Sequence, residues 1–236
     1  MKNSELFIDA YNKIDAFLKR EGNYDVNISF THKLKNSKNG IIRKRKDELI
    51  SYSELRNVIV HSPKIGESTI AEPSGETVKN IENICNSLLN PKKVIPLFQC
   101  QVMGAMKGDF INSILKEMKN KSFSQFPVFD ENGYVTELIT NNTICRWLAT
   151  NIESEGTLVV ENVKVETLLN EIEYNNNYKF VSRDCTVIDV YDLFTNTIEE
   201  KEHNLDAVFI TQNGKKNEKL LGIICIEDIA HEIKAL

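Results

Sequence analysis

One segment near the C-terminus places a carboxylate where it could bind a sugar. Gly222–Ile229 reads Gly-Ile-Ile-Cys-Ile-Glu-Asp-Ile, with Cys225 and Asp228 three residues apart. If a helix begins here, Asp228 lies in its first turn and can accept both hydroxyls of a ribose, beside free backbone N–H groups that favour an anion. A helix cap without any ligand is the alternative explanation of Asp228.

A related segment lies earlier in the chain. Glu137–Ile144 reads Glu-Leu-Ile-Thr-Asn-Asn-Thr-Ile, so Thr140 and Thr143 stand where the later segment has its thiol and its carboxylate. Thr140 keeps a hydroxyl that could contact a sugar or a phosphate, but Thr143 cannot replace a carboxylate. We therefore expect a single competent site, built around Asp228.

Basic residues follow both segments by one helical turn. Arg146 lies three residues after Thr143 and His231 three residues after Asp228, which places each on the same helix face as its partner. Either side chain could reach a phosphate group. A solvated basic residue on an exposed helix is the alternative.

A third segment could support acid–base chemistry on RNA. Arg56 and His61 are five positions apart near the end of an expected helix. Cleavage without metal needs a base of near-neutral pKa, which His61 could supply, and a fixed cation for the charged phosphorane, which Arg56 could supply. Alternatively, both side chains only favour the helix dipole at its C-terminal end.

The first 90 residues are expected to form a small helical unit. Apolar periodicity predicts helices over residues 4–20 and 46–60 and a third from Ser74 to Asn90, whereas residues 23–40 have little helical pattern. A run of basic residues in 33–46 has no acidic residue between Lys33 and Lys46, which indicates a solvated loop or a contact with RNA.

The rest of the chain repeats one order of elements. Strands are expected at 94–98, 126–130 and 134–139, with helices at 110–119 and from 141. The same order returns with strands at 178–182, 206–211 and 220–225 and helices at 187–199 and from 226. Because a single copy of a repeat cannot bury its own apolar face, the two copies must stack.

The repeat and its two segments resemble the CBS-domain family. The resemblance implies an α+β fold, in which an N-terminal helical bundle precedes two β-α-β-β-α motifs packed as a pseudo-two-fold pair, with domains at 1–90 and 91–236 and motifs at about 91–152 and 158–236. It implies a regulatory module that binds AMP, ADP, ATP or a related adenosyl ligand and requires no cofactor. Asp228 matches the family's ribose-binding position, whereas Cys225 replaces its usual Thr or Ser. Candidates for the base slot are Val181, Thr186 and Val208.

Residues 55–61 resemble the Arg-Asn-x-x-x-His motif of HEPN domains, helical bundles that include metal-independent ribonucleases. That resemblance implies Arg56 and His61 as catalytic residues, an active site formed where two bundles meet, and RNA held by the basic segment 33–46. Three hypotheses thus stand: a ligand-sensing CBS pair that modulates the helical domain and is no enzyme, an endoribonuclease regulated by that pair, and a homodimeric scaffold without ligand.

Composition narrows the class of protein further. The net charge of −5 argues against a dedicated DNA-binding protein, and no apolar run reaches the roughly 20 residues of a membrane helix. The N-terminal residues lack the features of a secretory signal, so we expect a cytoplasmic protein. The five cysteines include no C-x-x-C pair, so we expect no metal site and mostly buried thiols.

Overall fold

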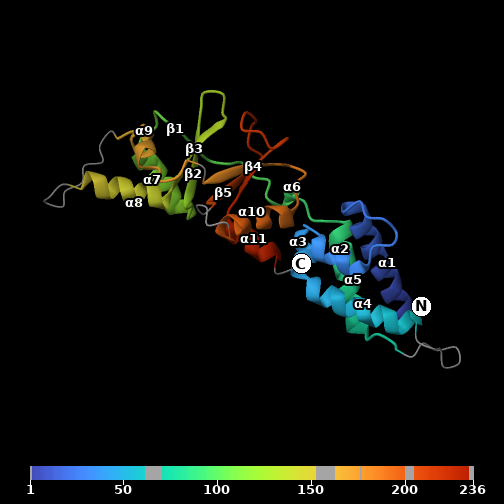
Figure 1. Ribbon diagram of the computed structural model, residues 1–236. Helices are drawn as coiled ribbons and strands as arrows, with labels where there is room; N and C mark the ends of the chain where they lie inside the picture. Colours follow the sequence, from blue (N-terminus) through green and yellow to red (C-terminus); the bar gives the residue numbers. More distant parts are fainter. Residues whose placement is uncertain (1, 62–70, 153–162, 176, 200–204, 234–236) are drawn as a thin grey trace. The chain divides into compact units, whose positions relative to one another are not determined.

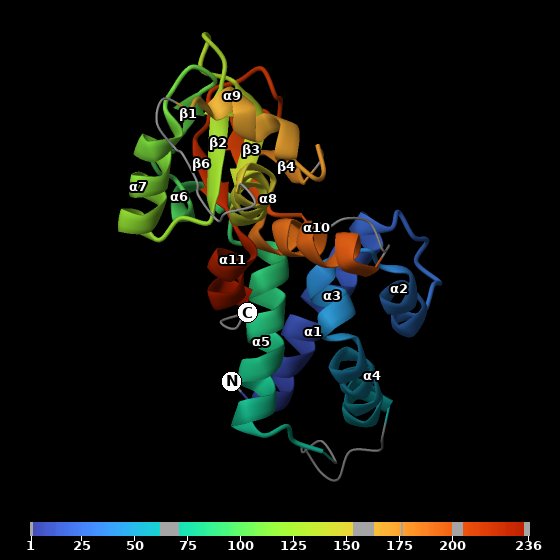
Figure 2. The ribbon, with the colours of Figure 1, turned by 90° about the vertical axis from the view of Figure 1, so that its left-hand side faces the viewer.

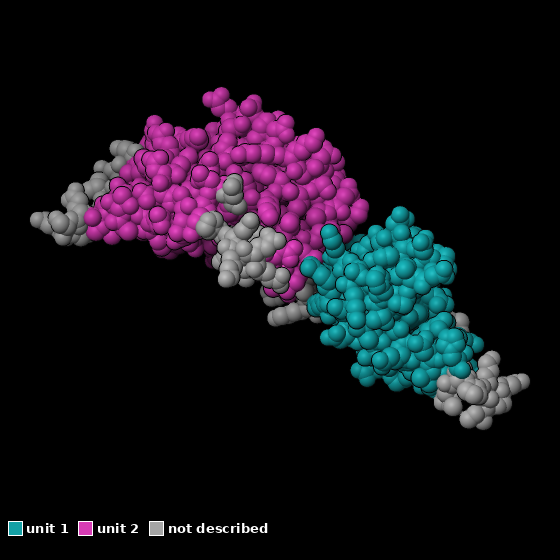
Figure 3. Space-filling view, viewed as in Figure 1, with its two compact units in different colours: residues 1–92, 234–236 teal, residues 93–233 magenta. Residues whose placement is uncertain are grey.

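The computed structural model describes residues 2–61, 71–152, 163–175, 177–199 and 205–233. Its contacts divide the chain into two compact units, one ending at Lys92 and the other running from Lys93 to Ile233 (Figure 3). The first unit contains only helices, and the second contains two sheets with their covering helices.

The helical unit has more helices than the sequence pattern predicts. Its helices are α1 (Asn3–Glu21), α2 (Phe30–Asn36), α3 (Gly40–Lys44), α4 (Lys46–His61) and α5 (Gly75–Leu89) (Figure 1). The three predicted helices are confirmed as α1, α4 and α5, but the expectation of no helix in residues 23–40 is wrong. Helices this short show little periodicity, and capping side chains start them: Ser29 accepts from the N–H of His32, and Asn39 from that of Ile41.

Helix α1 carries the apolar face around which this unit packs. Phe7, Ile14 and Leu18 are at most 1% exposed, and α1 packs beside α5. Phe7 also meets Tyr52 of α4 edge to face, with ring centroids 5.6 Å apart. The core therefore holds α4, which carries the Arg56–His61 segment, against α1.

The second unit contains the repeat. Its first half comprises α6 (Val94–Leu97), β1 (Ala105–Met106), α7 (Ile111–Lys121), β2 (Gln125–Phe129), β3 (Val135–Thr140) and α8 (Asn141–Asn151). Its second half comprises α9 (Val165–Leu168), the 3-10 turn η1 (Leu169–Glu171), β4 (Tyr178–Ser182), α10 (Val187–Glu199), β5 (Ala207–Thr211), β6 (Gly222–Ile224) and α11 (Ile226–Ile233). We refer to β1 to α8 as the first repeat and to β4 to α11 as the second repeat.

The strand expected at 94–98 is wrong. These residues form the short helical turn α6, interrupted at Ile95, and the first strand of the first repeat is instead β1. Pro96 has no N–H for a sheet ladder, and the N–H of Val94 donates to the carbonyl of Cys185 in the second repeat. Correspondingly, the N–H of Val165 in α9 donates to the carbonyl of Asp109 in the first repeat.

The two sheets have the same topology (Figure 2). In the order β1-β2-β3 the first pair is parallel and the second antiparallel, and β4-β5-β6 follows the same rule. One face of the first sheet packs on α7 and α8, and this core includes the fully buried Val128 and Ile139 together with Trp147. A second core joins the repeats, with Val135 and Leu138 of β3 against Ala207 and Phe209 of β5.

Candidate functional site

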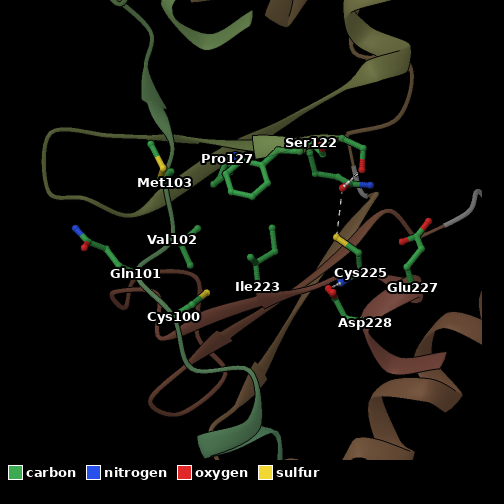
Figure 4. Close-up of a pocket in the computed structure, with 13 residues that line it drawn as sticks. Cys100, Gln101, Val102, Met103, Ser122, Pro127, Ile223, Cys225, Glu227 and Asp228 are labelled. Atoms are coloured by element: carbon green, nitrogen blue, oxygen red, sulfur yellow. Dashed lines mark hydrogen bonds between the residues drawn. The ribbon is translucent and has the colours of Figure 1, made fainter. Parts of the chain in front are cut away.

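A cavity of about 610 Å3 lies between segments of the two repeats (Figure 4). Its walls come from the stretch before β1, from the turn between α7 and β2, and from the junction of β6 with α11. The lining residues are Cys100, Gln101, Val102, Met103, Ser122, Phe123, Ser124, Gln125, Pro127, Ile223, Cys225, Glu227 and Asp228. The cavity thus includes the thiol and the carboxylate of the C-terminal segment.

Asp228 is both a helix cap and a cavity residue. One carboxylate oxygen accepts the N–H of Cys225 at 2.8 Å, which satisfies a backbone donor at the start of α11. The side chain is exposed and lines the cavity. A carboxylate has about four lone-pair sites, so the cap leaves acceptors for a second partner. The capping and binding explanations of Asp228 are therefore compatible.

Cys225 links the two repeats at the cavity wall. Its thiol donates to the side-chain oxygen of Gln125, with sulfur and oxygen 3.3 Å apart, and Ser124 donates to the same oxygen. Burial, with the negative charge of Asp228 beside it, raises the pKa of the Cys225 thiol to about 12. The thiol therefore stays protonated near neutral pH and acts as a weak donor.

In the first repeat the matching residues do a different job. The hydroxyl of Thr140 accepts the N–H of Thr143, and the hydroxyl of Thr143 accepts the N–H of Thr140, both at 3.3 Å. The two side chains are 7% and 4% exposed, and neither lines the cavity around Asp228. This reciprocal capping box occupies both hydroxyls in starting α8.

None of the three candidates for a base slot lines this cavity. Val181 and Val208 are buried, and Val208 alternates with Ala207 and Phe209, which face the first sheet, so Val208 points to the opposite face. The Thr186 hydroxyl donates to Asp189 at 2.6 Å and starts α10. The structure brings Cys225 and Asp228 together in the cavity, but none of these three residues is part of its lining.

Arg146, the basic residue beyond the first segment, does not line the cavity either. Arg146 lies 3.6 Å from the carboxylate of Glu173. The side chain of His231 lies outside the described residues.

Sequence reasoning missed two of the three cavity walls. Residues 100–103 and 122–127 have no strong pattern of their own, and their role depends on where the fold places them. One sequence signal for a close wall was the glycine at position 222. The structure gives its reason, because a Cβ there would lie 2.1 Å from the carbonyl oxygen of Phe98. Its neighbour Leu221 accepts the N–H of Cys100 at 3.1 Å, so the stretch before β1 runs beside β6. Glycine at this position therefore accommodates the wall that contributes Cys100.

In the helical unit, the two residues predicted for RNA chemistry are in contact. A guanidinium nitrogen of Arg56 lies 3.0 Å from the Nε2 atom of His61, and also donates to Asn57 at 3.3 Å. The Nε atom of Arg56 is buried without a hydrogen-bond partner among the described residues. The segment therefore forms a polar pair, with His61 exposed to solvent.

Part of the basic segment 33–46 is used within the fold. The ammonium of Lys33, only 3% exposed, pairs with Asp15. Arg45 lies 3.3 Å from Glu48. Lys33 therefore could contact RNA only by giving up a buried ion pair, whereas Lys35 and Lys38 remain exposed.

Metal ligands and disulfides are absent from the part of the chain that the structure describes. No group of His, Cys, Asp and Glu there could hold a metal ion. All five cysteines are free, but the expectation that most are buried is wrong, because only Cys85 is buried and Cys100 and Cys145 are exposed. Among the described helices, none is long and apolar enough to span a membrane.

One protein-family model matches part of the chain. The model of the CBS domain matches residues 169–235, which span the second repeat. No curated protein matches the chain. The C-terminal part of the chain therefore carries a CBS domain.

Solved structures whose backbone is similar to part of this chain include several CBS proteins. One is the CBS domain pair of protein MJ0100 in complex with 5′-methylthioadenosine and S-adenosyl-L-methionine, with 18% identity, coverage of 61% of this chain and 98% of that one, and a TM-score of 0.45. Another is a CBS domain-containing protein of unknown function from Kribbella flavida, with 14% identity, 58% and 95% coverage, and a TM-score of 0.45. A third, ATU1752 from Agrobacterium tumefaciens, has 16% identity, 56% and 83% coverage, and a TM-score of 0.40.

Proposed function

We propose that the CBS domain in residues 169–235 and the repeat before it act as a pseudo-two-fold pair that senses an adenosyl ligand. The ligand occupies the cavity between the repeats, with its ribose on Asp228. Its binding modulates the helical unit in residues 1–90. The function is regulatory, and this pair carries out no reaction of its own.

One observation carries this proposal: Asp228 lines a cavity of about 610 Å3 from the first turn of α11, within the segment that matches the CBS domain. That volume is within the range of small-molecule sites. The wall combines apolar residues such as Val102 and Ile223 with a few polar groups, as expected for a base and a sugar.

The contact between Cys225 and Gln125 suggests how binding could be transmitted. It joins the second repeat to the first at the cavity wall, beside the expected ribose position. A ligand that recruits Asp228 must fit against this contact and changes its geometry. The relative placement of the repeats is thereby coupled to occupancy.

Calorimetric titration of the whole 236-residue chain with adenosyl compounds tests the proposal. We expect binding by the wild type and loss of the signal in Asp228→Ala, because a charged hydrogen-bond acceptor contributes about 1.5–3 kcal/mol. Asp189→Ala is the matched control: Asp189 caps the start of α10 through Thr186 but does not line the cavity. Absence of binding by the wild type at millimolar ligand would refute the sensor function.

A second function, metal-independent RNA cleavage, is favoured by the contact between Arg56 and His61. With His61 as base and Arg56 as the fixed cation, the pair has the two groups that such a reaction needs. In the HEPN-like arrangement, two copies of the helical unit would form the active site, so this function also requires a homodimer.

Incubation with single-stranded and structured RNA in EDTA separates this function from the first. Cleavage that persists in EDTA and disappears in His61→Ala would establish it. His32→Ala is the matched control, because His32 is another exposed histidine on a helix of the same unit. Equal cleavage by wild type and His61→Ala would assign the activity to a contaminating nuclease. The contact between Arg56 and His61 would then have only a structural role. A tight dimer with neither binding nor cleavage would indicate the scaffold instead.

A further inference from the structure

The charged residues among those described in the cavity wall are all of one sign. Among the described residues that line it, the ionisable carboxylates are Glu227 and Asp228, and no lysine, arginine or histidine is present. Both acids are exposed and lie in the first turn of α11 (Figure 4). The other polar groups of the wall are neutral amides, hydroxyls and thiols.

One cation outside the lining, Lys121, touches a wall residue and lies near an acid of its own helix. The ammonium of Lys121 contacts the sulfur of Met103 at 2.9 Å and lies 3.9 Å from Glu117. Arg146, the basic residue that follows the capping segment of the first repeat, is paired with Glu173. Neither side chain is among the cavity residues.

The start of α11 attracts anions, but this effect is the smaller one. A helix N-terminus is equivalent to about half a positive charge, whereas two carboxylates carry about two negative charges. One oxygen of Asp228 also accepts the N–H of Cys225, so that donor is not available to a phosphate. The described groups that line the cavity therefore give its mouth a negative charge, and each phosphate added to a ligand is repelled by that charge.

We propose that the ligand of this cavity is an adenosyl compound without phosphate groups, either neutral or positively charged. This inference rests on the proposed sensor function and adds the charge class of its ligand. Asp228 takes the ribose, and Glu227 favours a cationic substituent at the 5′ side of the sugar over a phosphate. AMP, ADP and ATP share the adenosine part and bind more weakly in proportion to their charge.

A titration series of graded ligand charge tests this inference on the whole 236-residue chain. The probes are S-adenosyl-L-methionine, 5′-methylthioadenosine, AMP and ATP, each measured by calorimetry at low ionic strength. We expect affinity to fall in that order, and Glu227→Gln to strengthen AMP binding by about two- to fivefold, the range typical of exposed charge pairs. Glu131→Gln is the matched control, because Glu131 lies exposed in the turn between β2 and β3, at the opposite end of that hairpin from Gln125.

A second measurement needs no variant. Added salt screens exposed charges, so repulsion predicts that AMP binds the wild type more tightly at 0.5 M than at 0.05 M salt, while 5′-methylthioadenosine changes little. If AMP or ATP binds more tightly than 5′-methylthioadenosine and weakens with salt, the charge inference is overturned while the sensor function stands. If none of the four probes binds, both the sensor function and the charge inference are refuted.

Discussion

The two repeats start their last helices in the same way but with different chemistry. In both, the residue before the helix donates its N–H to the side chain three positions further on: Thr140 to Thr143, and Cys225 to Asp228. Thr143 is 4% exposed and its hydroxyl is used by the cap, whereas Asp228 is exposed at the cavity. A shared capping geometry therefore does not imply a shared site, because exposure and charge separate the two.

A second difference lies three residues before Thr140 and Cys225. Gly222 of the second repeat corresponds to Glu137 of the first. The second repeat needs glycine because the Phe98 carbonyl lies against its backbone. In the first repeat, a side chain at Glu137 is accommodated and only half-buried.

The largest expected effect is that of Gly222→Ala on stability. The added Cβ would meet a backbone oxygen at 2.1 Å, and forced rearrangement of this kind typically costs about 1–3 kcal/mol. Trp147, the sole tryptophan, is buried in the first repeat, so denaturant unfolding can be followed by its fluorescence. Gly108→Ala is the control because a Cβ there meets nothing within 4 Å. Equal unfolding midpoints for the two variants would contradict the prediction.

Thr143→Asp tests whether a carboxylate alone makes a site. We expect a loss of about 2 kcal/mol in unfolding free energy, because the position is 4% exposed and a buried carboxylate loses its hydration. We also expect the calorimetric stoichiometry of ligand binding to stay that of the wild type. A second equivalent of bound ligand would show that exposure matters less than charge.

Thr140→Val should have a smaller effect, confined to the first repeat. It removes the hydroxyl that accepts the N–H of Thr143, and losing such a cap costs about 1 kcal/mol. Thr150→Val is the control in the same helix, since the Thr150 hydroxyl only donates to a carbonyl within α8. Trp147 fluorescence during denaturation measures the unfolding free energy of both variants. A loss for Thr140→Val no larger than that for Thr150→Val would mean that the Thr140 cap does not stabilise the first repeat.

The smallest effect concerns alkaline pH and the thiol of the second repeat. Burial raises the pKa of Cys225 to about 12, above the roughly 8.5 of a free thiol. The stability that depends on a protonated Cys225 thiol is fully present below the pKa of this thiol in the unfolded chain. It is lost as the pH rises from that value toward 12. Between pH 9 and 10 the loss is about 1 kcal/mol at most.

Cys225→Ser should remove this slope, and Cys145→Ser, which alters an exposed thiol of the first repeat, should keep it. Urea unfolding at pH 8, 9 and 10 measures the difference. Parallel pH curves for wild type and Cys225→Ser would mean that partial burial does not raise the pKa of the Cys225 thiol in solution.

Most elements of this protein follow from local sequence. Apolar periodicity located the long helices α1, α4 and α5, and β-branched runs bounded by Asn-Gly turns located the hairpins of both repeats. The segment around Asp228 stands out because it resembles the motif of the CBS-domain family, and a helix start also needs a capping acceptor, which is a local requirement. The short helices α2 and α3 and the turn α6 were missed because their caps and buried contacts, rather than their periodicity, make them helical.

The cavity, in contrast, depends on contacts between residues far apart in the chain. Gln125 meets Cys225 across 100 positions, and the N–H of Cys100 donates to the carbonyl of Leu221, directly before β6. The sequence alone determined that a carboxylate would begin the final helix, since hydrogen bonding to a helix start is decided within four residues. Only the tertiary structure decided which wall faces that carboxylate and that Thr143, its counterpart, is buried, because burial is a property of how the sheets stack.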